Sequence, residues 1–164
     1  MLILKPLIML RNYFSLHVYR RYKNQFTDLE PDLPISISRL ADHCYGHLEW
    51  KEDPINGLMD HIQPIKHMNW QLKTNGMIEG DCDDLATWIG WMLKRMGIKH
   101  VKRVNIVKYK HVICVFFDPK HEKWRYFSNA SLKTGMFKST RQCVDAWCER
   151  KKHKPTRWFY TENM

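Results

Sequence analysis

The chain has 164 residues, of which 44% are hydrophobic and 13% aromatic, so it can bury a core and is not expected to be disordered. Its formal net charge of +10 is concentrated in segments 11–23, 94–110 and 150–157. This charge suits an acidic partner, but no nucleic-acid-binding motif accompanies it, so nucleic acid is not the expected ligand. We expect a single domain over residues 1–164, with a basic tail over 140–164.

The cysteine content and the N-terminus indicate a cellular compartment. An odd number of cysteines with no CxxC pair argues against a disulfide framework and predicts a reducing, cytoplasmic environment. The apolar opening, residues 1–10, is too short to span a bilayer, and no small-residue cleavage site follows it. We expect it to begin a helix packed on the core, with an amphipathic surface anchor as the alternative.

The N-terminal part of the chain, residues 1–65, is expected to form a helical extension. The ends of its helices are not sharply marked in the sequence. Residues 1–25 indicate a helix or a buried segment, and the prolines of 26–36 predict an extended connection. Ser36 or Ser38 could cap a short helix that ends near Asp53. Residues 54–79 are ambiguous apart from a helical turn expected at 57–61.

A helix beginning near Gly80 has the clearest pattern in the chain. Its apolar residues recur with the spacing of one helical face: Leu85, Trp88, Ile89, Met92, Leu93 and Met96. Asp81 is a favourable N-cap, Asp84 completes a variant of the capping box, and Gly97 supplies a C-terminal stop. The aspartates therefore have a structural role at this helix end.

Three segments rich in β-branched and aromatic residues follow this helix, at 101–109, 111–117 and 123–129. The last two are separated by the turn-like sequence DPKHEK. We expect an antiparallel meander, then a short helix over 140–150. The predicted fold class is α+β, with the helix that contains Cys82 packed on a small antiparallel sheet, and Trp88 and Met92 buried between them.

Cys82 lies in the first turn of the predicted helix. Free backbone N–H groups and the positive end of the helix dipole favour a thiolate there, whereas Asp81, Asp83 and Asp84 oppose it. A cationic histidine nearby would decide the balance, since the thiolate–imidazolium pair is the usual way to activate such a cysteine.

His111 is the histidine best placed to serve as that base, because it opens a predicted strand. With the hairpin turn centred at Lys120, His111 lies opposite Asn129 and on the same face of the sheet, where the Asn129 amide oxygen could fix the imidazole tautomer. Asp118 would lie roughly 23 Å along the strand, which excludes it as the orienting group. A register shift by one residue leaves Ser128 and Ser131 as weaker candidates.

The segments GDCDDLATWIGWMLKRMGI, KHVICVFF and WRYFSN together resemble the core of the transglutaminase-like superfamily of papain-type cysteine enzymes, closest to the bacterial transglutaminase-like cysteine peptidases. The resemblance covers about residues 70–132. It implies a nucleophile at Cys82, a general base and acid at His111 and an orienting residue at Asn129. Most members of the superfamily carry aspartate at the third position, so asparagine removes a charge that would stabilise the imidazolium.

The resemblance also carries expectations for the oxyanion hole and for metal. The backbone N–H of Cys82 and an upstream side chain, Trp70 or Gln71, would bind the oxyanion. No cofactor is implied, except that acidic residues flanking the cysteine bind calcium in some peptidases of this group; Asp81 and Asp83 are the matching positions. Helix capping is the simpler explanation for both.

The predicted function is a thiol-dependent amide hydrolase, a cysteine peptidase acting on a protein or peptide substrate. One alternative is an amide-transferring or crosslinking transglutaminase-like enzyme, which shares the acyl-enzyme intermediate. Another is a catalytically inactive module that binds an acidic partner. A zinc site is disfavoured because no second cysteine pair completes the candidate ligands His43, Cys44, His47, His61 and His67; Cys143 and Cys148 are expected to be core thiols.

Overall fold

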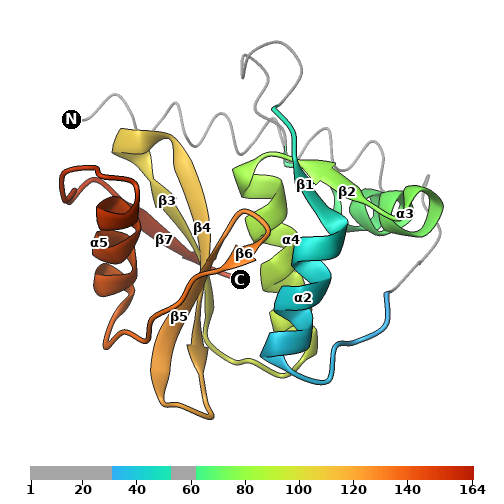
Figure 1. Ribbon diagram of the computed structural model, residues 1–164, viewed down its shortest axis with the longest axis horizontal. Helices are drawn as coiled ribbons and strands as arrows, with labels where there is room; N and C mark the ends of the chain where they lie inside the picture. Colours follow the sequence, from blue (N-terminus) through green and yellow to red (C-terminus); the bar gives the residue numbers. More distant parts are fainter. Residues whose placement is uncertain (1–30, 53–61) are drawn as a thin grey trace.

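The computed structural model describes residues 31–52 and 62–164, and these form an α+β fold. A five-stranded antiparallel sheet carries helices on both faces, and a separate two-stranded parallel sheet lies beside one of the helices (Figure 1). The segments predicted at 1–25 and 57–61 lie outside the described residues.

The large sheet has the strand order β6-β5-β4-β3-β7. Its strands are β3 (Val101–Ile106), β4 (His111–Asp118), β5 (Lys123–Ser128), β6 (Ser131–Leu132) and β7 (Tyr160–Asn163). The predicted meander is therefore confirmed as β3, β4 and β5. β7 was not predicted, because it follows a basic segment and forms by pairing with β3 across 55 residues or more of chain, the nearest pair being Asn105–Tyr160.

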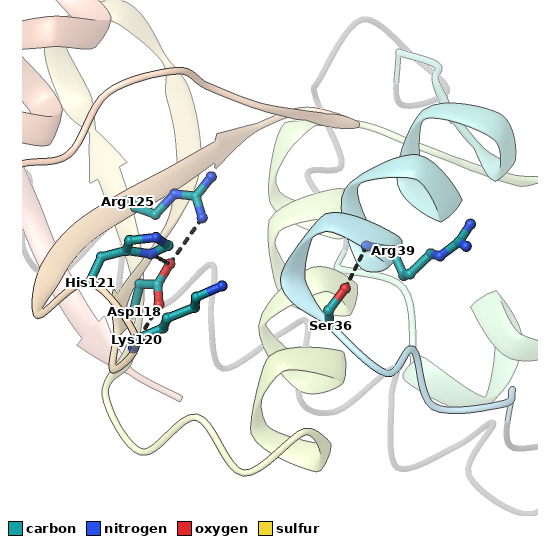
Figure 2. A network of polar contacts seen from close by, with 6 residues as sticks. All are labelled: Ser36, Arg39, Asp118, Lys120, His121 and Arg125. Atoms are coloured by element: carbon teal, nitrogen blue, oxygen red, sulfur yellow. Dashed lines mark hydrogen bonds and ion pairs between the residues drawn. The ribbon is translucent and has the colours of Figure 1, made fainter.

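Four α-helices are described, α2 (Ile37–His47), α3 (Ile65–Asn75), α4 (Cys82–Arg95) and α5 (Thr140–Arg150), together with the 3-10 helix η1 (Val107–Tyr109) between β3 and β4. The Ser36 hydroxyl accepts the Arg39 N–H, which confirms the predicted cap of α2 (Figure 2). The predicted end near Asp53 is wrong, because β1 (Leu48–Trp50) leaves the helix to pair with β2 (Ile78–Gly80). α3 was missed because its N-cap is Pro64, which offers no side-chain acceptor.

The helix α4 packs on one face of the large sheet, as predicted. Trp88 and Met92 are fully buried in a core that also contains Val112, Cys114 and Phe116 of β4. Ile113 and Val115, the intervening residues of β4, point to the other face, where they pack with α5. The two faces of one strand thus belong to two separate cores.

The hairpin that joins β4 to β5 is closed by a buried carboxylate. Asp118 is 1% exposed and accepts hydrogen bonds from Arg125 Nη1 at 3.0 Å, from His121 Nδ1 at 2.9 Å and from the Lys120 N–H at 3.0 Å (Figure 2). These contacts hold the pKa of Asp118 below its usual value, although burial acts in the opposite direction. Asp118 is therefore a turn-forming residue, in agreement with its predicted exclusion as an orienting group.

None of the helices in residues 31–52 and 62–164 is long and apolar enough to cross a membrane.

Candidate functional site

Cys82 is the first residue of α4, directly after the predicted N-cap. The Asp81 carboxylate accepts hydrogen bonds from the backbone N–H groups of Asp83 at 3.0 Å and Asp84 at 3.3 Å. The thiol therefore sits where the helix dipole favours an anion. Cys82 is partly buried and packs against the core between α4 and the sheet.

The turn before Cys82 is held by a side chain from outside the motif. Gln63 donates its backbone N–H to Asp84 Oδ1 at 2.6 Å, and its side-chain Nε2 to Asp84 Oδ2 at 2.8 Å and to the Glu79 carbonyl at 2.8 Å. Asp84 is fully buried, and these bonds compensate for the loss of its hydration. Gln63 thus links β2 to the first turn of α4.

Gly80 is required by this close packing. A Cβ at this position would lie 2.7 Å from the Asp84 Cβ and 2.7 Å from its Oδ2. We expect Gly80→Ala to destabilise the protein by about 1–3 kcal/mol, because the Asp84 side chain cannot move without breaking its bonds to Gln63. Urea denaturation of the full chain measures the change.

Gly46→Ala is the matched control for this prediction. It lies inside α2 with nothing within 4 Å of the added Cβ. Alanine there should stabilise the protein by up to about 1 kcal/mol through helix propensity. If Gly80→Ala were as harmless as Gly46→Ala, the Asp84 contact would not be rigid.

Cys82 is the accessible thiol of this protein. All five cysteines lie in the described part of the chain, and the other four are buried: Cys44, Cys114, Cys143 and Cys148. Burial raises the pKa of Cys143 to about 12, and raises the pKa values of the other three above the usual range of a thiol. Cys143 and Cys148 are core thiols, as predicted.

The register of the β4–β5 hairpin differs from the prediction by one residue. Ile113 pairs with Ser128, so the position opposite Asn129 belongs to Val112 and not to His111. The hydrogen bond of the His111 ring is accordingly to Ser128, from Nε2 to Oγ at 3.0 Å. The predicted His111–Asn129 pairing is wrong in this structure, and the weaker candidate Ser128 takes its place.

The His111 ring lies on the face of the sheet that α5 covers. It stacks on Trp147, with ring centroids 4.8 Å apart and an interplanar angle of 14°. Cys82 packs into the core on the opposite face. The two residues nonetheless lie at the same end of the molecule, because α4 and β4 both begin there (Figure 1).

The surroundings of His111 favour its neutral form. Burial, together with the positive charges of Lys151 and Lys133, lowers the pKa of His111 to about 4, while the negative charge of Asp81 acts in the opposite direction. His111 is therefore a neutral proton acceptor at pH 7. A thiolate–imidazolium pair, which the sequence predicts as the activated form, is disfavoured in this arrangement.

Asn129 occupies a left-handed conformation with φ 49° directly after β5, a conformation that asparagine tolerates better than most residues. Its Oδ1 is buried and has no hydrogen-bond partner within the described residues. A buried amide oxygen left in this state costs free energy, so its position requires an explanation.

The two predicted oxyanion donors both lie on α3. The Trp70 side chain is 40% exposed and its ring is 5.8 Å from that of His67, while Gln71 Oε1 is buried without a hydrogen-bond partner among the described residues. The residue of α3 that binds α4 is instead Asn69, whose Oδ1 accepts the Trp88 indole N–H at 2.9 Å.

The carboxylates of Asp81, Asp83 and Asp84 gather at the start of α4, with one ligand oxygen from each within 4.8 Å of the others. They form the one group of metal-ligating side chains in residues 31–52 and 62–164. Helix capping and the contacts with Gln63 account for Asp81 and Asp84. Hard oxygen ligands of this kind would suit calcium rather than a transition metal.

The histidines considered for zinc do not form a site in the described chain. His43 and His47 lie on one face of α2 with ring centroids 4.5 Å apart, but His47 Nδ1 contacts the Gly76 carbonyl at 2.8 Å and Cys44 is fully buried. His61 lies outside the described residues.

Sequence reasoning missed two residues of this region, Gln63 and Trp147. Gln63 precedes a helix with no recognisable cap, in a segment without periodicity. Trp147 lies on a helix that the sequence places correctly, but its contact with His111 depends on which face of β4 carries that histidine. Comparison of the sequence with models of known protein families found no match, and comparison with curated protein sequences found none either.

Proposed function

We propose that this protein is a thiol-dependent amide hydrolase of the transglutaminase-like, papain-type class, which forms an acyl-enzyme on Cys82. The observation that carries the proposal is the placement of Cys82: a partly exposed thiol at the N-terminus of a buried helix, in a chain whose other four thiols are buried. The helix dipole supplies the first part of the activation.

His111 is the proposed base. It is held in its neutral form, and it lies at the end of the sheet where α4 begins. The negative charge of Asp81, next to Cys82 in the chain, reaches His111 strongly enough to oppose the lowering of its pKa. The proposal requires the Cys82 thiol and the His111 imidazole, which lie on opposite faces of the sheet, to meet once the ring leaves Ser128.

Asn129 completes the proposed mechanism. The proposed active state requires the His111 side chain, at the first residue of β4, to leave Ser128 and turn around the strand end toward Cys82 and Asn129, where it would supply a donor for the buried Asn129 Oδ1. In that state the imidazole would accept the proton of the Cys82 thiol, and the thiolate would attack the amide carbonyl. The imidazolium would then protonate the leaving amine, and water would release the acyl group.

Labelling with an acyl-donating, thiol-directed probe tests this function. We expect the probe to label Cys82 in the wild type and to label none of the cysteines in Cys82→Ala. His111→Gln should slow labelling by about 100-fold or more, since proton transfer to a positioned base contributes that much. Mass spectrometry locates the label, and the rate is followed over time.

Substitutions at two neighbouring residues distinguish the contact that His111 makes in the resting structure from the contact proposed for catalysis. Asn129→Ala should slow labelling by roughly tenfold, because it disturbs orientation rather than proton transfer. Ser128→Ala removes the bond that holds His111 on the α5 side, so labelling should be unchanged or faster. The opposite order of effects would show that the Ser128 arrangement is the working one, and equal labelling of several cysteines would refute the proposal.

One observation favours a second candidate, a binding module without catalysis: the His111 ring is stacked on Trp147 and bonded to Ser128. In a protein without catalytic activity, His111 would serve only to pack against Trp147 and to bond Ser128. Such a protein would bind its partner equally well with Cys82→Ala, and would show no Cys82-dependent labelling.

A further inference from the structure

Two cations, Lys151 and Lys133, act on His111, and Arg150 lies beside Lys133. Lys151 caps α5 and donates its backbone N–H to the carbonyl of Trp147, the residue whose ring stacks on His111. Lys133 follows β6, and Arg150 is the last residue of α5. The chain thus brings positive charge from two elements to the start of β4.

Hydrogen bonds hold the Arg150 guanidinium and the backbone of Lys133 in place. Arg150 Nη2 donates to Thr134 Oγ1 at 2.7 Å, which ties the end of α5 to the residue after Lys133. The Lys133 backbone N–H donates to the Tyr126 carbonyl at 3.0 Å, two residues before Ser128. The guanidinium is therefore oriented before any ligand binds.

The three cations have no acidic partner in the described chain. Within residues 31–52 and 62–164, ion pairs form elsewhere, at Lys51, Arg103, His121, Arg125 and Arg141. Burial and the neighbouring charges of Lys151 and Arg150 lower the pKa of Lys133. Like charges held this close raise each other's energy, and a bound anion would relieve the repulsion.

We propose that Lys133, Arg150 and Lys151 form a subsite for a carboxylate of the substrate, so that the enzyme acts on amides next to an acidic side chain. The inference rests on the proposed function, since it places the subsite beside the reacting groups. The chemistry is that of a carboxylate accepting charge-assisted hydrogen bonds from an oriented guanidinium and two ammonium groups. A free phosphate offers similar oxygens, and protection of Cys82 by phosphate or by an acidic peptide distinguishes the two.

Two alkylating reagents that differ in charge measure the electrostatic potential at Cys82, and no substrate is needed. Iodoacetate carries a carboxylate and iodoacetamide is neutral, so the ratio of their rates at Cys82 reports attraction of an anion. In the variant K133Q/R150Q/K151Q this ratio should fall about three- to tenfold at low ionic strength, and the effect should shrink in high salt. The iodoacetamide rate of the same variant is the reference, because any change in the thiolate fraction of Cys82 alters both rates alike and cancels in the ratio.

The matched control is K99Q/K120Q/K123Q, which removes the same charge at the other end of α4 and of the hairpin, about 20 Å from Cys82 along the helix. Its ratio should stay within about twofold of the wild type, because charges at that distance are screened. Equal falls in both triple variants, or no fall in either, would overturn the subsite. If the triple variant unfolds because Arg150 loses Thr134, the double variant K133Q/K151Q serves instead, with a smaller expected fall.

Protection of Cys82 from iodoacetamide identifies the ligand. A short glutamate-containing peptide should protect the wild type at about one-fifth of the concentration needed by its glutamine counterpart, a preference that the triple variant should lose. Protection by inorganic phosphate but not by the acidic peptide would overturn the assignment to a substrate carboxylate. Slow iodoacetamide labelling of the wild type would instead refute the activated thiol while leaving the charge ratio readable, so the two proposals fail separately.

Discussion

Replacing Trp88 by alanine is expected to destabilise the protein by about 3–5 kcal/mol, among the largest effects of any single substitution in this chain. The Trp88 ring is fully buried, stacks on His43 with centroids 5.8 Å apart, and donates its indole N–H to Asn69 Oδ1 at 2.9 Å. Alanine would leave a cavity between three helices and an acceptor, 5% exposed, without its donor. Urea denaturation with a constant m-value measures the loss.

Two controls separate the parts of this effect. Trp88→Phe keeps most of the ring and removes the hydrogen bond, so it should cost about 1–3 kcal/mol. Trp158→Ala removes a tryptophan that is 60% exposed and should change stability by less than about 0.5 kcal/mol. A Trp88→Ala variant as stable as Trp158→Ala would mean that α2 and α3 do not depend on this contact.

The stability of the wild type is expected to fall between about pH 6.5 and pH 4 through His111. The ordinary pKa of 6.5 applies to the unfolded chain, whereas the folded pKa is about 4. Between these values the unfolded state binds a proton that the folded state does not, so acid favours unfolding; above pH 6.5 the contribution is constant. The full difference is about 3 kcal/mol, lost progressively as the pH falls.

The variant His111→Gln tests this linkage. Its free energy of unfolding should lose the part of the pH dependence that lies between about pH 6.5 and pH 4, so that the wild-type and variant curves converge toward acid. The titration of the His111 ring protons by NMR gives the folded pKa directly. Lys151→Gln should raise that pKa, because it removes a positive charge. A midpoint near 6.5 in the wild type would contradict the buried, neutral His111.

The neutral state of His111 also affects its proposed role as the base that deprotonates Cys82. A base with a pKa of about 4 is a weak acceptor for a thiol proton, and rotation of the ring out of the contact with Trp147 would return it toward its ordinary value. Activity that rises with a midpoint well above pH 4 would therefore report the rotated state. The resting hydrogen bond between His111 and Ser128 would then slow deprotonation of the Cys82 thiol.

Local signals in the sequence were sufficient wherever the structure depends on neighbouring residues. The apolar spacing from Leu85 to Met96 and the cap at Asp81 define α4, because helix formation and capping involve residues at most four positions apart. Ser36 identifies the start of α2 for the same reason. The strands of the hairpin are equally visible from their composition, and the placement of Cys82 at a helix start follows from these local rules.

Tertiary structure alone decided the features that depend on distant partners. β1 and β7 are too short to be recognised and exist by pairing with β2 and β3, and α3 has no cap that its sequence announces. The hairpin register is the most consequential case. The loop closes with Asp118 opposite Lys123, so Ser128 and not Asn129 shares the face of His111. Side chains alternate between the faces of a strand, so a shift of one residue moves the partner of the histidine to the other side of the sheet, and only the packing of both cores selects the register.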